Sequence, residues 1–122
     1  MSAYQSPLSI TEVKDVRVVE FTANKILDEA NIKEIGDAIG GLVDDREQPR
    51  LLVDFSHVDH LSSAALGMLI NVNSKIRAKN GMLRLSNIKP QIREVFVITK
   101  LDKLFKILPT RQEALDSFTG PG

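Results

Sequence analysis

Ser62 and Ser63 are the first side chains to consider, because two adjacent hydroxyls stand where an apolar strand pattern changes into a helical one. A serine before a helix can act as its N-cap, since the hydroxyl accepts a hydrogen bond from a backbone N–H that the helix leaves unpaired. The same end of a helix carries partial positive charge, so a phosphate added there is electrostatically tolerated. The sequence therefore predicts a capping serine and a displayed hydroxyl, and either residue could fill either role.

A carboxylate and two histidines lie just before these serines. Asp54 ends the apolar run, where a carboxylate can accept backbone N–H groups of the following loop or act directly on a partner. His57, Asp59 and His60 follow in the loop and could suggest a metal site or an acid–base couple. They lack a further ligand at a known spacing, so we predict solvated loop residues and no metal or other cofactor.

A buried strand and an amphipathic helix position these groups. Leu51, Leu52 and Val53 form a short, continuous apolar run, which is typical of a strand buried on both faces. Beyond the serines, apolar residues recur at helical spacing, which indicates one face of a helix. The residues of that face are Ala65, Met68, Leu69, Val72 and Ile76.

The same helix carries a second apolar stripe and a glycine. Leu66 and Ile70 lie beside the core face, where they either pack inside or form a partly exposed docking surface next to Ser63. Gly67 lowers helix stability, and a glycine inside a helix often marks close packing against a neighbour. We therefore expect the strand and the helix to pack closely at Gly67.

The chain before this unit holds a hairpin and a helix. Residues 8–21 show two β segments with a polar turn at Lys14 and Asp15, which predicts an antiparallel hairpin. Asp28 is a candidate N-cap, and an apolar helix face follows it. The residues of that face are Ile32, Ile35, Ala38, Ile39 and Leu42.

Shorter elements follow the central helix. Residues 82–85 predict a buried strand, Pro90 opens a helix, and residues 101–108 include a short edge strand. Thr110 and Glu113 form a capping-box pattern before a last helix. We predict an α/β fold with a mixed four- to five-stranded sheet that starts with an antiparallel hairpin, and with about four helices.

Length and composition exclude several classes of protein. The 122 residues fit a single domain, 1–122, in which 1–7 and 119–122 are expected to be loose. Lysine plus arginine equal aspartate plus glutamate at 16 each, so no overall field favours nucleic acid or an anionic membrane. The absence of cysteine excludes disulfides and thiol catalysis. We expect no signal peptide and no membrane insertion, and hence a cytoplasmic protein.

The hinge region resembles the signature of the STAS domain, the fold of the bacterial anti-sigma factor antagonists, in the pattern D-F-S-x-V-x-x-L-S-S-A-A-L-G. The residues that match are Asp54, Phe55, Ser56, Val58, Leu66 and Gly67. Ser63 falls on the phosphoacceptor position of the family. The chain departs from the pattern at Ser62, Ala64 and Ala65, where aspartate, a second hydroxyl residue and glycine are usual. Lys100 stands where a glycine is frequent.

This resemblance implies a regulatory binding module. The module would bind an anti-sigma factor that is also a serine protein kinase, accept phosphate on Ser63, and be reset by a serine phosphatase. ATP and the catalytic groups would belong to the kinase, and the chain shows no catalytic motif of its own, so we predict that it is not an enzyme. The implied partner-binding residues are Asp54, Ser56, Asp59, Ser62, Leu66 and Ile70. Nucleic acid is not an expected partner, and the sequence is compatible with a monomer or a dimer.

Two alternatives stay open. A non-phosphorylated STAS module, serving as a scaffold or a transporter accessory, would use Ser63 only at the start of the helix. A receiver-like phosphotransfer domain would instead accept phosphate on Asp54 with Mg²⁺, since doubly wound sheets place their sites at the carboxyl ends of strands. The first strands end without the paired acidic residues that would hold Mg²⁺, which counts against the second alternative.

Overall fold

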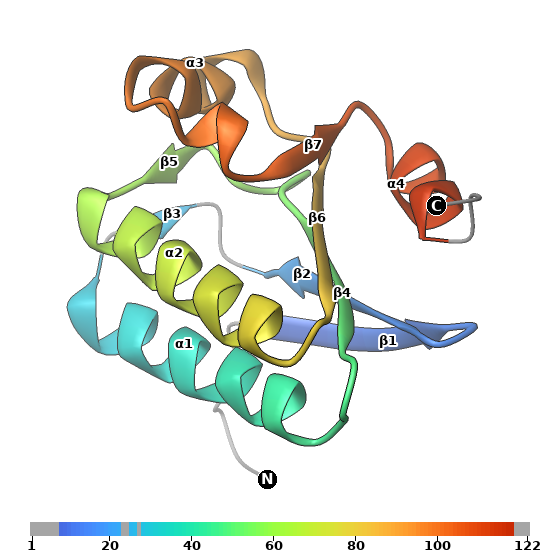
Figure 1. Cartoon of the computed structure of the whole chain (residues 1–122). Coiled ribbons are helices and arrows are strands. Elements are labelled where there is room, and N and C mark those ends of the chain that lie inside the picture. Colours follow the sequence, from blue (N-terminus) through green and yellow to red (C-terminus); the bar gives the residue numbers. More distant parts are fainter. Residues whose placement is uncertain (1–7, 23–24, 27, 119–122) are drawn as a thin grey trace, which may run out of the picture.

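The computed structural model describes residues 8–22, 25–26 and 28–118, which contain one five-stranded sheet (Figure 1). Its strands, in the order in which they pair, are β1 (Leu8–Val13), β2 (Val16–Phe21), β4 (Arg50–Asp54), β6 (Met82–Ser86) and β7 (Lys106–Leu108). β1 and β2 form an antiparallel hairpin, and the other pairs are parallel. The predicted mixed sheet with its starting hairpin is confirmed, while the ends predicted to be loose, 1–7 and 119–122, lie outside the described residues.

Helices cover both faces of this sheet. The described residues form the α-helices α1 (Glu29–Asp44), α2 (Ser63–Ala78), α3 (Pro90–Ile98) and α4 (Arg111–Ser117), together with a 3₁₀ turn, η1 (Leu101–Lys103). In Figure 1, α1 and α2 lie side by side against one face, α4 lies on the other side of the sheet, and α3 and η1 stand together at one end. The predicted α/β class and the predicted helices are therefore confirmed.

A second, very small sheet was not predicted. It consists of β3 (Lys25–Ile26) and β5 (His60–Leu61), which pair in parallel. Strands of two residues are too short to show a hydrophobic period, so the sequence gives no sign of them. The pair joins the segment that leads into α1 to the segment that leads into α2, and both helices begin at this side of the molecule (Figure 1).

The larger part of the core lies between the sheet and α1 and α2. All the residues predicted for the core face of α2 are buried, and in α1 the buried residues include Ile32, Ile35 and Ile39. Ala38, predicted for the same face of α1, is exposed instead. One residue rotates the side-chain direction by about 100°, so Ala38 points well away from the direction of Ile39.

Four phenylalanines form a continuous row beneath the end of the sheet where α3 stands. Phe21 contacts Phe55 with ring centroids 5.2 Å apart, Phe55 contacts Phe96 at 6.4 Å, and Phe96 contacts Phe105 at 5.8 Å. All three contacts are edge-to-face, which is the favourable geometry for aromatic rings. Phe55 directly follows β4, so this row fixes the base of the loop that leads to the two serines.

At the opposite end of the sheet, the turn between α2 and β6 packs on the segment before β4. The N–H of Met82 donates to the carbonyl of Pro49 at 2.8 Å, and Lys79 Nζ donates to the carbonyl of Val43 at 2.9 Å, near the end of α1. A Cβ added to Gly81 would lie 2.3 Å from the Pro49 carbonyl oxygen. No side chain fits that space, so the close approach requires glycine at this position.

Gly81→Ala is therefore expected to destabilise the fold by about 1–3 kcal/mol, because the backbone of Pro49 or of the turn must move. Gly41→Ala is the matched control, since its Cβ would meet no atom within 4 Å and alanine is the better helix former. We expect that control to stabilise the protein by up to about 1 kcal/mol. Urea unfolding measures both, and equal effects of the two substitutions would contradict the packing argument.

Lys100, the residue that stands where glycine is frequent in the family, adopts the left-handed conformation with φ 63° and ψ 17°. A side chain is unfavourable there, so Lys100→Gly is expected to raise the free energy of unfolding by about 0.5–1 kcal/mol. Lys103→Gly, three residues later in η1, should lower it instead, because that position has ordinary helical geometry. Unfolding midpoints at low micromolar concentration compare the two variants.

Candidate functional site

The two serines divide the two expected roles between them. Ser62 is the N-cap of α2: its backbone is extended, and its Oγ accepts the N–H of Ala65 at 3.2 Å. Ser63 is the first residue of the helix, and it is exposed. The cap therefore does not depend on the hydroxyl of Ser63, which faces solvent at the positive end of α2.

The charges along α2 leave that positive end uncompensated. The first turn of α2 contains no acidic residue, whereas the last turn carries Lys75 and Arg77. In α1, by comparison, the capping residue Asp28 and the first residue Glu29 are both acidic. An anionic group on Ser63 would thus meet unpaired N–H groups and the helix dipole without a neighbouring carboxylate in its own first turn.

Asp54, at the end of the central strand β4, holds the loop that leads to these serines. Only 1% of the residue is exposed, and its carboxylate accepts three hydrogen bonds. The donors are the backbone N–H of Ser56 at 2.8 Å, Asn87 Nδ2 at 3.1 Å and Arg111 Nε at 2.8 Å. Burial raises the pKa of Asp54, but these hydrogen bonds to its charged form outweigh burial and hold the pKa below its ordinary value.

Arg111 is a site residue that the sequence analysis missed. It is the first residue of α4, and its guanidinium bridges Asp54 and Glu20, with an Nη2–Oε1 distance of 3.0 Å to the latter. The hydrogen bond to Asp54 also raises the pKa of Arg111. The sequence offered one signal, because an arginine in the first turn of a helix opposes the helix dipole, but this signal does not identify a partner.

Two further contacts join the loop between β4 and β5 to other parts of the chain. The carboxylate of Asp59 pairs with Lys89 Nζ, just before α3, and His57 Nε2 lies 3.7 Å from Glu20 Oε1. His57 and His60 are both exposed. Among the residues that the structure describes, no group of three or more histidine, aspartate or glutamate side chains is placed to hold a metal ion.

The apolar stripe predicted beside the core face of α2 packs inside. Leu66 is 7% exposed and belongs to the core, and Ile70 is partly buried and packs against it. Of the two possibilities that the sequence left open, inward packing is therefore the one observed. Leu66 and Asp54 are buried, whereas Ser56, Asp59 and Ser62 are partly exposed.

Next to Ser63, the exposed side of α2 borders an open groove of about 660 Å³ between α1 and α2. Ala64, Gly67 and Asn71 line it from α2, and Gly36 lines it from α1. The prediction of close packing at Gly67 is wrong, because a Cβ added to this residue would meet no atom within 4 Å. Gly67 faces the groove rather than a neighbouring strand, so its missing side chain keeps the groove open.

Comparisons with known proteins agree with this geometry. The STAS domain family matches residues 8–114. BtrV of Bordetella bronchiseptica, named as a candidate anti-sigma factor antagonist, is 30% identical over 93 residues, which cover 76% of this chain and 79% of BtrV.

Two solved structures show the same fold. A STAS-domain anti-sigma-factor antagonist protein from Planctomyces limnophilus has a TM-score of 0.85 at 23% identity, covering 93% of this chain and 98% of that one. The Bacillus cell fate determinant SpoIIAA, solved in its phosphorylated form, has a TM-score of 0.69 at 18% identity, covering 91% of this chain and 98% of that one.

Within the described residues, no helix has the length and apolar character needed to cross a membrane. The chain therefore belongs to the STAS domain family and resembles its anti-sigma factor antagonists, which are regulators rather than enzymes.

Proposed function

We propose that this chain is a binding module for an anti-sigma factor that is also a serine kinase, switched off by phosphorylation of Ser63. One observation carries the proposal: Ser63 presents an exposed hydroxyl in the first turn of α2, while its neighbour Ser62 supplies the cap. The hydroxyl is thus available to a kinase and has no structural task that phosphate would interrupt. A serine phosphatase would restore the unmodified form.

The proposed partner surface surrounds this hydroxyl. Ser56, Asp59 and Ser62 are partly exposed on the loop and at the helix start, so they are the residues proposed to touch the partner. Asp54 and Leu66 are buried, so their part is to hold that surface in place from below. The groove between α1 and α2 begins at Ala64, directly beside Ser63, and extends the same surface.

The switch follows from charge rather than from a change of fold. A phosphoserine carries roughly −1.5 to −2 charges near neutral pH. A complex would strip water from that charge at a large cost, and an interface formed around a neutral hydroxyl supplies no opposite charge to offset it. Phosphate on Ser63 would therefore release the partner while the domain stays folded. SpoIIAA, a protein of this fold solved in a phosphorylated form, supports the idea that the fold tolerates phosphate.

The alternatives receive less support from the geometry. A receiver-like domain needs Asp54 open to a phosphodonor, but this carboxylate is 1% exposed and bound by Arg111. A scaffold that is never phosphorylated would leave Ser63 without a role. Ala64 and Ala65 bear no hydroxyl, so within this turn Ser63 is the single exposed acceptor.

The first test combines phosphorylation and binding. Incubation with ATP and serine kinases of the anti-sigma factor class from the source organism should place one phosphate on Ser63, as mapped by mass spectrometry. Ser63→Ala should take up no phosphate and bind the kinase as well as the unmodified protein does. Ser63→Asp should bind at least about tenfold more weakly, because it places a charge in the interface.

Ser62→Ala is the matched control for that experiment. It removes the cap at a loss of about 1 kcal/mol of stability, yet Ser63 should still be phosphorylated. Two results would contradict the proposed switch. One is phosphate on Ser62 instead of Ser63, and the other is a kinase that binds Ser63→Ala and Ser63→Asp equally well. A complete lack of phosphate with active kinases would favour the scaffold alternative.

The support that Asp54 gives the loop predicts a pH dependence. The pKa of Asp54 is lowered in the folded state, so its stabilisation is present above the unfolded-state value of about 3.9 and is lost as the pH falls through the folded-state value. Asp54→Asn should lower the free energy of unfolding near neutral pH by about 2 kcal/mol. The variant should also lose less of this free energy than the wild type as the pH falls. Asp37→Asn, which removes the charge of an exposed pair with Lys33, should change stability by less than about 0.5 kcal/mol.

A further inference from the structure

The turn between α2 and β6 contains Asn80 followed by Gly81, which is the single Asn–Gly pair of the sequence. Such a pair can lose ammonia without an enzyme, because the glycine nitrogen attacks the side-chain amide of the asparagine and no Cβ on the glycine hinders its approach. The other five asparagines are each followed by a residue with a side chain. Asn80 is therefore the position of the chain where this chemistry is least hindered.

The reaction needs only these two residues and water. The Gly81 nitrogen gives its proton to hydroxide or water and forms a bond to Cγ of Asn80. The bond from Cγ to Nδ2 breaks, and Nδ2 leaves as ammonia after taking up a proton. Water then opens the cyclic imide at either of its carbonyl groups. One product is aspartate, and the other is isoaspartate, in which the main chain passes through Cβ and Cγ and is one atom longer.

The folded turn holds the reacting groups apart. Asn80 is exposed, so water reaches its amide, but its φ of 56° places the backbone in the left-handed region. In that region ψ is about +47°, and the nitrogen of the next residue points away from Cβ across the Cα–C bond. Ring closure needs the nitrogen and Cβ on the same side. The N–H of Gly81 also donates to the carbonyl of Ile76 at 2.8 Å, so its proton is held by the last turn of α2.

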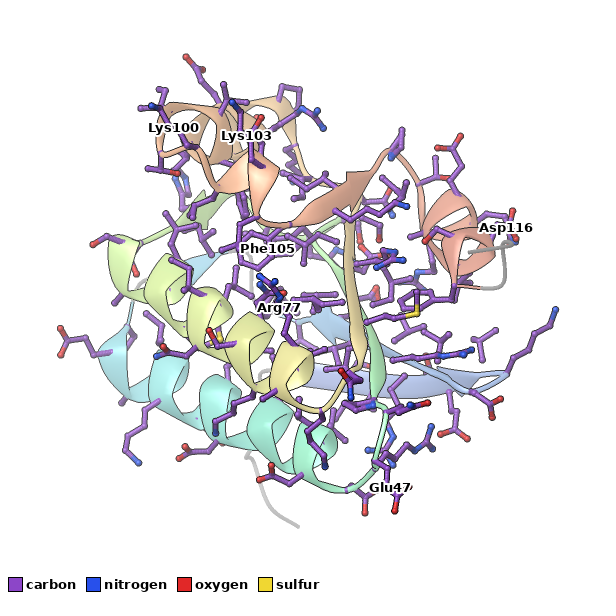
Figure 2. All side chains as sticks on the ribbon, viewed as in Figure 1. Glu47, Arg77, Lys100, Lys103, Phe105 and Asp116 are labelled. Atoms are coloured by element: carbon purple, nitrogen blue, oxygen red, sulfur yellow. The ribbon has the colours of Figure 1, made fainter. Side chains whose placement is uncertain are left out.

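The segment before β4 keeps this turn from rotating. A Cβ on Gly81 would lie 2.3 Å from the carbonyl oxygen of Pro49, and the same oxygen accepts the N–H of Met82 at 2.8 Å. Figure 1 shows the turn beside the connection from α1 to β4, and the Glu47 side chain that Figure 2 labels on that connection points outward. The connection therefore meets the turn through the backbone of Pro49, which leaves no room for the peptide to turn over.

A lysine ties the same turn to the end of α1. Lys79 Nζ donates to the carbonyl of Val43 at 2.9 Å and to the carbonyl of Asp44 at 3.1 Å. These bonds hold the residue directly before Asn80 against another helix. The peptide between Asn80 and Gly81 can thus reach the reactive arrangement only when the end of α2 separates from its neighbours.

We propose that Asn80 is a site of spontaneous deamidation that the fold keeps closed, so that the reaction proceeds only while the end of α2 is open. Local opening of this kind occurs in folded proteins without global unfolding. The amount of product then reports how long the turn has been open over the lifetime of the chain.

Neither product fits the folded turn as well as asparagine does. Both place a carboxylate at the C-terminal end of α2, where the helix dipole is negative. Isoaspartate also lengthens the main chain by one atom directly before Gly81, which has no spare space against Pro49. Modified chains should therefore unfold at a lower temperature than unmodified chains, and the modification marks them.

Peptide mapping of the protein after incubation at mildly alkaline pH tests the proposal. One sample stays folded, and the other is unfolded in guanidinium chloride. Mass spectrometry detects the exchange of NH₂ for OH, and chromatography separates the aspartate peptide from the isoaspartate peptide. In denaturant, Asn80 should react at least about tenfold faster than the other asparagines, which serve as internal controls. In the folded protein, its rate should fall by at least about tenfold.

A substitution that loosens the turn tests the role of opening. Lys79→Ala should raise the rate at Asn80 in the folded protein by about fivefold, the effect of losing one or two hydrogen bonds. It should leave the rate in guanidinium chloride unchanged, which shows that the local sequence is not the cause. Lys75→Ala, the same change at an exposed lysine one turn earlier, should change neither rate. Circular dichroism checks that both variants are folded.

Three results would overturn the proposal. The first is a lack of modification at Asn80 in the unfolded chain, which would show that the pair is not a reactive site. The second is an equal rate in the folded and unfolded wild type, which would show that the fold does not protect the pair. The third is an equal effect of Lys79→Ala and Lys75→Ala, which would show that the end of α2 does not control the reaction.

Discussion

The carboxylate of Asp54 joins the main parts of the site through hydrogen bonds from the loop after β4, from Asn87 after β6 and from Arg111 at the start of α4. A carboxylate that is almost fully buried is tolerated only while such donors remain in place. The same contacts therefore fix three separate chain segments at the carboxyl edge of the sheet. The position of Ser63 depends on this edge, because the loop that Asp54 anchors leads directly into α2.

Two other contacts make the support of the site rigid. The row of phenylalanines from Phe21 to Phe105 lies beneath the loop, and the close approach of Gly81 to Pro49 fixes the opposite end of α2. Close-packed interiors have low compressibility, so this support resists deformation. Under the proposed function, a partner would meet the Ser63 hydroxyl in a fixed position, and a change of charge at this residue would alter binding without rearrangement of the core.

Local patterns in the sequence predicted the helices and strands well. They did not predict contacts between residues that are distant in the sequence. The hairpin turn at Lys14 and the caps at Asp28 and Thr110 depend on neighbours within a few residues, so each could be predicted from residue types. The Asp54–Arg111 pair joins residues 57 positions apart, and no local pattern encodes such a pair. The role of Ser62 as the cap likewise needed backbone geometry, since both serines are equally good caps by type.

One departure of this chain from the family pattern, serine at position 62, is explained by the geometry of the cap. An aspartate at the position of Ser62 would place a negative charge directly beside a phosphate on Ser63, whereas the serine caps α2 without charge. The helix start then offers a phosphate the dipole and free N–H groups with less repulsion than the usual sequence provides. If Ser63 is phosphorylated as proposed, serine in place of aspartate would lower the repulsion on the phosphate within the free domain, and the opposition to phosphate would come from the partner's surface.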